Sequence, residues 1–134
     1  MGQRFLKVAA VYFTIGVLMG LVMGIMQDFR LTSVHAHINL LGWVSMALFG
    51  LVYHFYPRAG NTKLAKTQFW LHNIGVPVMQ GGLAVEIITG NMALMPVVIG
   101  GSLLVILGVI LFMFNVFAHV GTLNIGKSDR DVAS

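Results

Sequence analysis

The stretch VHAHINLLGWVSMALFGLVYHFY, residues 34–56, decides the fold. It contains no Asp, Glu, Lys or Arg, and most of its side chains are aliphatic or aromatic. An α-helix rises ~1.5 Å per residue, so about 20 apolar residues cross the ~30 Å hydrocarbon core of a bilayer. The stretch therefore predicts a transmembrane helix that carries histidines near both of its ends.

Three more apolar stretches accompany this one. They cover residues 5–26, 69–88 and 92–120, and short polar segments separate them. Links of this length place consecutive helices side by side and antiparallel. We therefore expect an all-α membrane protein, a single domain over residues 1–134 with four transmembrane helices. The last stretch is the longest, which predicts that its helix tilts or protrudes from the bilayer.

The composition supports this class and excludes several others. The chain has 134 residues, of which 57% are hydrophobic and 9% charged, whereas a soluble domain carries roughly 25% charged residues. The absence of cysteine excludes disulfides, thiolate metal sites and iron–sulfur clusters. A bound metal would need His, Met, Asn or a carboxylate. The net charge of +4 is not interpreted as nucleic-acid binding, because the positions of the basic residues have another explanation.

The basic residues predict the orientation of the helices. Seven of them fall at or before the start of the first stretch, between the second and third, or after the fourth: Arg4, Lys7, Arg58, Lys63, Lys66, Lys127 and Arg130. These positions lie on one side of a four-helix membrane protein, and only Arg30 lies on the other. Because basic loops stay in the cytoplasm, both ends of the chain are expected there, in a multi-pass protein of a bacterial inner membrane.

Histidines and one acid inside the apolar stretches are the candidate functional residues, because ionisable groups are costly in a bilayer. His35, His37 and Glu86, with Asn39 close by, form an expected outer layer. His54 and His72, with His119 as a weaker candidate, form an expected inner layer. The inner histidines fit equally well into an interfacial aromatic belt with the nearby Tyr and Trp residues, and His119 fits a solvated helix end better than a ligand.

The spacing of His35 and His37 favours a planar cofactor over a single metal ion. Two residues apart on a helix, their side chains differ by ~200° in direction and point to nearly opposite faces. One helix can then offer a ligand to each of two partners. Haem iron is commonly held by His, and helical bundles build cofactor sites from side chains on facing helices.

Small residues and one proline predict how the helices pack. Gly16, Gly20 and Gly24 form a stripe at four-residue spacing, which allows close backbone approach either within the chain or between subunits. Pro77 should kink its helix and free a carbonyl. Gln80 is a candidate partner for that carbonyl.

The segment from His35 to Trp43, HAHINLLGW, and its continuation YHFYP from Tyr53 resemble segments of short proteins related to haem–copper oxidase subunit I, especially the cbb3 type. They are also similar to stretches of NnrS-type membrane haem proteins. The resemblance implies that the four helices correspond to one of the three four-helix arcs of subunit I. It further implies that His35 is similar to the high-spin haem ligand and His37 to the low-spin haem ligand. No equivalent of the oxidase copper site is present in the sequence.

The resulting hypothesis is a membrane protein that binds haem b through His37 and His35. Asn39 and Glu86 would assist by orienting an imidazole or meeting the propionates, and His54 and His72 are weaker candidates for ligands. The expected chemistry is electron transfer or binding of nitric oxide or oxygen, with oxidoreductase activity left open. A homo-oligomer, preferably a trimer, would complete the sites among lipids and other respiratory membrane proteins. Two alternatives are a copper- or zinc-binding or transporting protein, and a structural or assembly subunit.

Overall fold

The computed structural model describes residues 1–121, and within that range the chain is helical and contains no strand. Two long α-helices, α1 (Gly2–Met26) and α5 (Lys63–Thr89), alternate with two composite ones. The first composite helix joins α2 (Thr32–His37), a π-helix η1 (Ile38–Val44) and α3 (Ser45–Phe55). The other joins a 3-10 turn η2 (Met92–Leu94) to α6 (Met95–His119), and the short α4 (Pro57–Gly60) links the two halves of the molecule.

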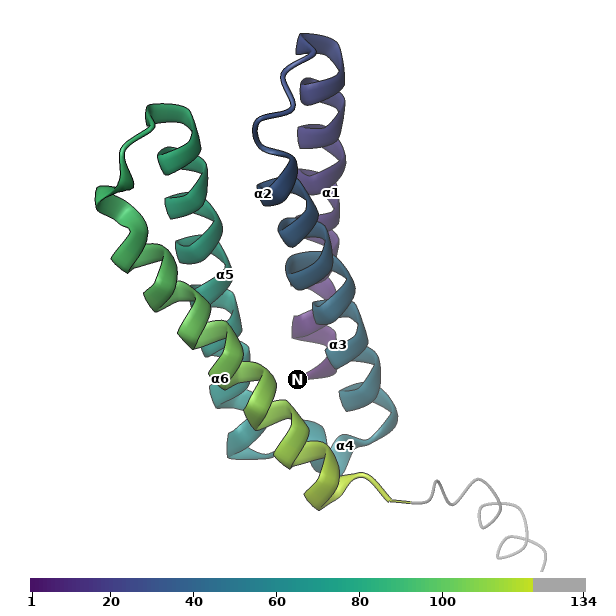
Figure 1. Cartoon of the computed structure of the whole chain (residues 1–134). Coiled ribbons are helices and arrows are strands. Elements are labelled where there is room, and N and C mark those ends of the chain that lie inside the picture. The colour runs from purple at the N-terminus through teal and green to yellow at the C-terminus, as the bar shows by residue number, and fades with distance from the viewer. Residues whose placement is uncertain (122–134) are drawn as a thin grey trace, which may run out of the picture.

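The helices form two antiparallel pairs (Figure 1). One pair is α1 with the composite helix α2–η1–α3, and the other is α5 with α6. The pairs meet at the end where α4 lies and diverge toward the opposite end, which carries the two other loops (Figure 1). The consecutive, antiparallel order is the one that the short links predict.

The observed bounds match the apolar stretches closely except at the start of α5. That helix begins at Lys63 rather than at the expected residue 69. The reason is local: the Thr62 hydroxyl accepts a hydrogen bond from the Ala65 N–H (3.1 Å), which caps the helix before its apolar part begins. At its other end, Gly90 closes the helix with a left-handed φ of 68°, a conformation that glycine adopts without steric cost.

Three helical segments are long and apolar enough to cross a membrane: Gly2–Met26, Thr32–Phe55 and Met92–His119. The helix α5 has 27 residues, which is also sufficient length. Its mean hydropathy is lower because it carries Gln68, His72, Gln80 and Glu86, all of which are buried. These four polar side chains therefore face the protein interior rather than its surroundings.

An aromatic cluster closes the end at which the two pairs meet. Phe5 of α1 is fully buried, and its ring centroid lies 5.0 Å from that of Phe69, 5.5 Å from Tyr53 and 5.8 Å from Phe49. The contacts with Phe49 and Phe69 are edge-to-face, a favourable arrangement of aromatic quadrupoles. This cluster joins α1, α3 and α5 below the more open part of the molecule.

Glycines let α5 and α6 approach at the backbone level. A Cβ atom added to Gly101 would lie 2.6 Å from the backbone nitrogen of Met79, and one added to Gly75 would lie 2.9 Å from the Gly101 carbonyl oxygen. Small residues at helix crossings give van der Waals contact where apolar surroundings provide little hydrophobic driving force. Any larger residue at either position would force this pair apart.

Candidate functional site

The central feature of the site is the π-helix η1, which follows His37 directly. At its end the Ser45 N–H bonds the Leu40 carbonyl, five residues back instead of the four of an α-helix. Where such wide turns return to α geometry, a carbonyl is left without its usual main-chain donor. Short π segments of this kind are uncommon and occur often at functional sites. The apolar pattern of residues 34–56 predicts one regular helix and gives no sign of this turn.

A histidine from the other helical pair binds the π turn. His72 of α5 has 0% exposure, and its Nε2 lies 2.8 Å from the carbonyl oxygen of Leu41. Because a carbonyl can only accept, Nε2 carries the hydrogen. Its Nδ1 has no hydrogen-bond partner among residues 1–121. His72 therefore lies in the core against the π turn, rather than in an inner layer with His54.

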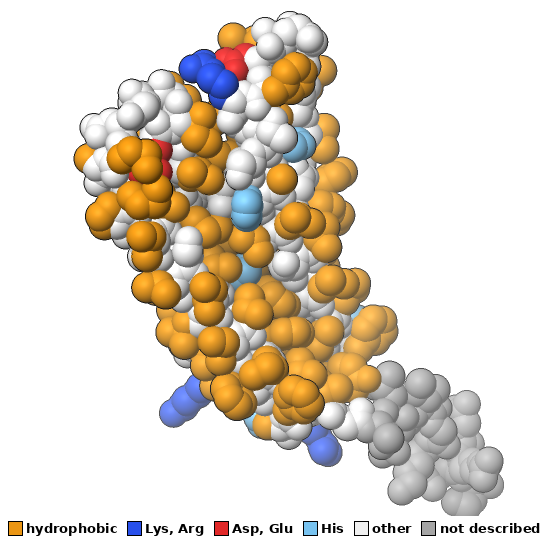
Figure 2. Space-filling model, viewed as in Figure 1, with side chains coloured by type: hydrophobic (Ala, Val, Ile, Leu, Met, Phe, Trp, Pro, Cys, Tyr) orange, Lys and Arg blue, Asp and Glu red, His pale blue; other side chains and the backbone are white. Residues whose placement is uncertain are grey.

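His37 is exposed and faces the opposite helical pair. Its Nδ1 lies 2.7 Å from the Ser33 carbonyl oxygen, so Nδ1 carries the hydrogen of the neutral ring and Nε2 keeps its lone pair. The side chain lines a groove of about 410 Å³ whose other walls are mostly aliphatic: Leu41, Met79, Val105, Ile106, Val109 and Ile110. Figure 2 shows histidine side chains along the furrow between the two halves of the molecule. The ring is thus fixed at one nitrogen, and its free nitrogen is available at an apolar surface.

His35 points the other way, toward α1. A Cβ atom added to Gly20 would lie 3.0 Å from His35 Cε1, so the imidazole lies directly on the glycine. Asn39 takes the same direction: its Nδ2 donates to the His35 carbonyl (2.9 Å), and its carboxamide lies over Gly16. The two imidazoles therefore lie on opposite sides of the helix, as their spacing predicts. Asn39 accompanies His35 and not His37.

The glycine stripe of α1 serves packing within the chain at two of its three positions. Gly16 and Gly20 hold the Asn39 and His35 side chains, whereas Gly24 has nothing within 4 Å of the position of an added Cβ. Close approach is thus used to seat polar side chains, not only to bring backbones together.

The remaining candidates are dispersed over the molecule. Glu86 is 5% exposed, and its Oε1 has no hydrogen-bond partner among the described residues. His54 is exposed at the α4 end, and His119 Nδ1 lies 3.2 Å from the Asn115 carbonyl. Within residues 1–121 no three His, Asp or Glu side chains gather closely enough to hold one metal ion. His35, His37 and Glu86, the expected outer layer, are thus not gathered around one point in the described part of the chain.

A buried polar network near α4 was not predicted from the sequence. The Tyr53 hydroxyl donates to Gln68 Oε1 and accepts from Asn115 Nδ2 (3.1 Å). Asn115 Nδ2 also donates to the Ala59 carbonyl (2.9 Å), and Thr62 donates to Asn115 Oδ1 (3.1 Å). Tyr53 is consequently a core residue that joins α3, α4, α5 and α6, not a member of an interfacial belt. The signal in the sequence was the pair of amides, Gln68 and Asn115, in otherwise apolar surroundings.

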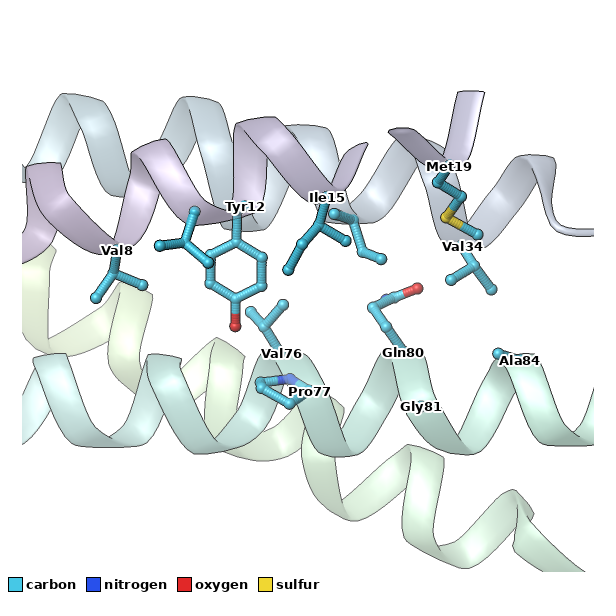
Figure 3. Close-up of a pocket in the computed structure, with 12 residues that line it drawn as sticks. Val8, Tyr12, Ile15, Met19, Val34, Val76, Pro77, Gln80, Gly81 and Ala84 are labelled. Atoms are coloured by element: carbon cyan, nitrogen blue, oxygen red, sulfur yellow. The ribbon is translucent and has the colours of Figure 1, made fainter. Parts of the chain in front are cut away.

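A separate cavity of about 500 Å³ lies between α1 and α5. Figure 3 shows Tyr12 and Gln80 extending into the space between these helices, next to Pro77. Gln80 is the expected partner for the carbonyl that Pro77 frees, and its Oε1 has no hydrogen-bond partner among the described residues. Its carboxamide lines the cavity instead.

Comparison of the chain with family models, with curated proteins and with solved structures finds no match. The resemblance of residues 35–57 to oxidase subunit I and NnrS-type proteins therefore stays a prediction from those residues.

Proposed function

We propose that the protein spans a bacterial cytoplasmic membrane four times and binds haem b through His37. Three of the spans are the segments that are long and apolar enough by themselves. The fourth is α5, whose buried polar side chains explain its lower hydropathy and leave an apolar surface for lipid. An antiparallel partner, α6, accompanies α5 along its length (Figure 1).

The charged residues support an orientation with both ends of the chain in the cytoplasm. Among the described residues, the basic side chains other than Arg30 belong to α1's first turns, α4 and the start of α5, at the end where the pairs meet. At the opposite end Arg30 is neutralised by Asp28, with 2.7 Å between Nη2 and Oδ2 (Figure 2). Hydrogen bonds from Arg30 hold the pKa of Asp28 below its usual value. Lys127 and Arg130, which the sequence places on the side opposite to Arg30, lie outside the described residues.

The observation that carries the haem proposal is the state of the His37 ring. A hydrogen bond from Nδ1 to a backbone carbonyl sets the tautomer and orientation that favour coordination through Nε2, as is common for metal-ligating histidines. The aliphatic groove beside it suits the faces of a porphyrin. A bound haem would supply one-electron chemistry or an open position for a diatomic gas such as nitric oxide or oxygen.

The opposite direction of His35 favours assembly. It lies on the α1 side, so its imidazole cannot complete the coordination of an iron held by His37 of the same chain. His35 of a neighbouring chain would provide the second ligand in a homo-oligomer. A trimer is preferred because three four-helix arcs make the twelve helices of the resembling subunit. Its surroundings would be lipid and other respiratory membrane proteins.

An absorption spectrum of the protein, purified after expression with ample haem, tests the proposal. We expect a Soret band that is lost in His37→Ala and retained in His54→Ala, since His54 is exposed at the other end of the same helix. Size-exclusion chromatography of each variant reports whether it folds. A folded wild-type protein without a Soret band would contradict haem binding, and copper or zinc without porphyrin would favour the metal-transport alternative.

A further inference from the structure

The cavity between α1 and α5 has the character of a site for a neutral, lipid-soluble molecule. Its volume is about 500 Å³, within the usual range for small-molecule sites. Of the twelve residues in the described range 1–121 that line it, none is charged, and ten have aliphatic side chains, a proline ring, a thioether or no side chain. A phosphate headgroup would therefore find no counter-charge inside it.

Among the described residues, two polar side chains reach this cavity, Tyr12 from α1 and Gln80 from α5 (Figure 3). Gln80 is 3% exposed, and its Oε1 is buried without a hydrogen-bond partner among the described residues. Buried amides are nearly always bonded, because an unpaired group forfeits its hydration. The Gln80 carboxamide therefore calls for a partner that residues 1–121 do not provide.

The cavity also opens sideways. Val11 and Ile15, on its α1 wall, are 58% and 46% exposed. In the proposed membrane orientation these residues face the hydrocarbon, so a ligand would enter from the bilayer and not from water. The apolar rim would accommodate a chain that extends into the lipid.

We propose that this cavity binds a quinone or quinol, with the ring between α1 and α5 and the isoprenoid tail leaving past Val11 and Ile15. A carboxamide presents a donor on one side and an acceptor on the other, and a phenol hydroxyl does both. Gln80 and Tyr12 can therefore bond either the carbonyl or the hydroxyl oxygens of such a ring. The ring itself matches the otherwise uncharged, apolar lining. This proposal does not depend on haem.

Two substitutions should impair ligand binding in the cavity without preventing the protein from folding. Gln80→Leu removes the unpaired amide while keeping a similar volume, which should leave the empty protein at least as stable. Gly81→Leu places a side chain in the cavity, and an added Cβ there has nothing within 4 Å. Gln3→Leu, on the exposed start of α1 outside this cavity, is the control.

Calorimetric titration of the purified protein with a short-chain quinone, with its quinol and with farnesol tests the assignment. We expect the quinone or quinol to bind at least ten-fold more tightly than farnesol. Binding should weaken about ten-fold in Gln80→Leu, be lost in Gly81→Leu, and persist in Gln3→Leu and His37→Ala. Equal binding of farnesol, or unchanged quinone and quinol affinity in Gln80→Leu and Gly81→Leu, would overturn the proposal.

Discussion

The Nε2 of His72 lies 2.8 Å from the carbonyl oxygen of Leu41, and this contact joins the two helical pairs at the π turn. Leu41 lies four residues beyond His37, within the π-helix η1. The contact comes from a fully buried side chain, so water cannot replace it in the folded protein. His72 thereby contacts the backbone of the helix that carries His37, and this hydrogen bond does not involve the His37 side chain.

Replacing this donor should destabilise the protein. In His72→Leu the side-chain volume is roughly kept, but the Leu41 carbonyl loses its partner in the core. The expected loss in the free energy of unfolding is about 1–3 kcal/mol, the usual penalty for a buried group left unsatisfied. Thermal unfolding in detergent measures it, with the exposed His54→Leu as the matched control. Equal melting temperatures for the two variants would show that the contact has little energetic weight.

Gly16 and Gly20 of α1, against which the side chains of Asn39 and His35 pack, should not tolerate a larger residue. An alanine Cβ at Gly16 would lie 2.5 Å from Asn39 Oδ1, so Gly16→Ala must displace that side chain or the helix. Overpacking of this kind typically costs about 1–3 kcal/mol. Gly24→Ala is the control on the same stripe, because it meets nothing within 4 Å. A lower melting temperature is expected for the first variant only, and equal effects would contradict this packing.

The buried tyrosine near α4 should contribute through its hydroxyl. Tyr53→Phe keeps the ring in the aromatic cluster but leaves Gln68 Oε1 without its donor and takes one acceptor from Asn115. We expect a loss of about 1–3 kcal/mol in unfolding free energy. Tyr56→Phe is the comparison, since Tyr56 is only half-buried. If both variants unfold together with the wild type, the network is not a stabilising element.

The orientation can be measured because the chain contains no cysteine. A single cysteine at Asn91 lies in the loop between α5 and η2, and one at Asn61 lies between α4 and α5. With four spans and cytoplasmic ends, a membrane-impermeant maleimide added to intact cells should label Asn91→Cys and not Asn61→Cys. Labelling of both after lysis confirms that each thiol is accessible. If both react equally in intact cells, α5 does not cross the bilayer.

Hydropathy and short links predicted the helices and their order, because long apolar runs can bury their backbone polar groups only as helices. Hydropathy did not predict that α5 begins at Lys63, because this start depends on the capping hydroxyl of Thr62 and not on apolar residues. The directions of His35 and His37 followed from helical geometry. The burial of His72 and Tyr53 could not be predicted in the same way: their partners, Leu41, Gln68 and Asn115, are 15 or more positions away in sequence.

The π turn also determines the rotation of one half of its helix against the other. A wide turn holds one residue more than an α turn, and each residue of an α-helix advances by about 100°. If the residues of Ile38–Val44 formed a regular α-helix with none removed, Tyr53 would be rotated by about 100° relative to His37. Either the polar network or the histidine would then lose its direction. The extra residue of the π turn therefore sets the angle between the direction of His37 and the direction of Tyr53 on the same composite helix.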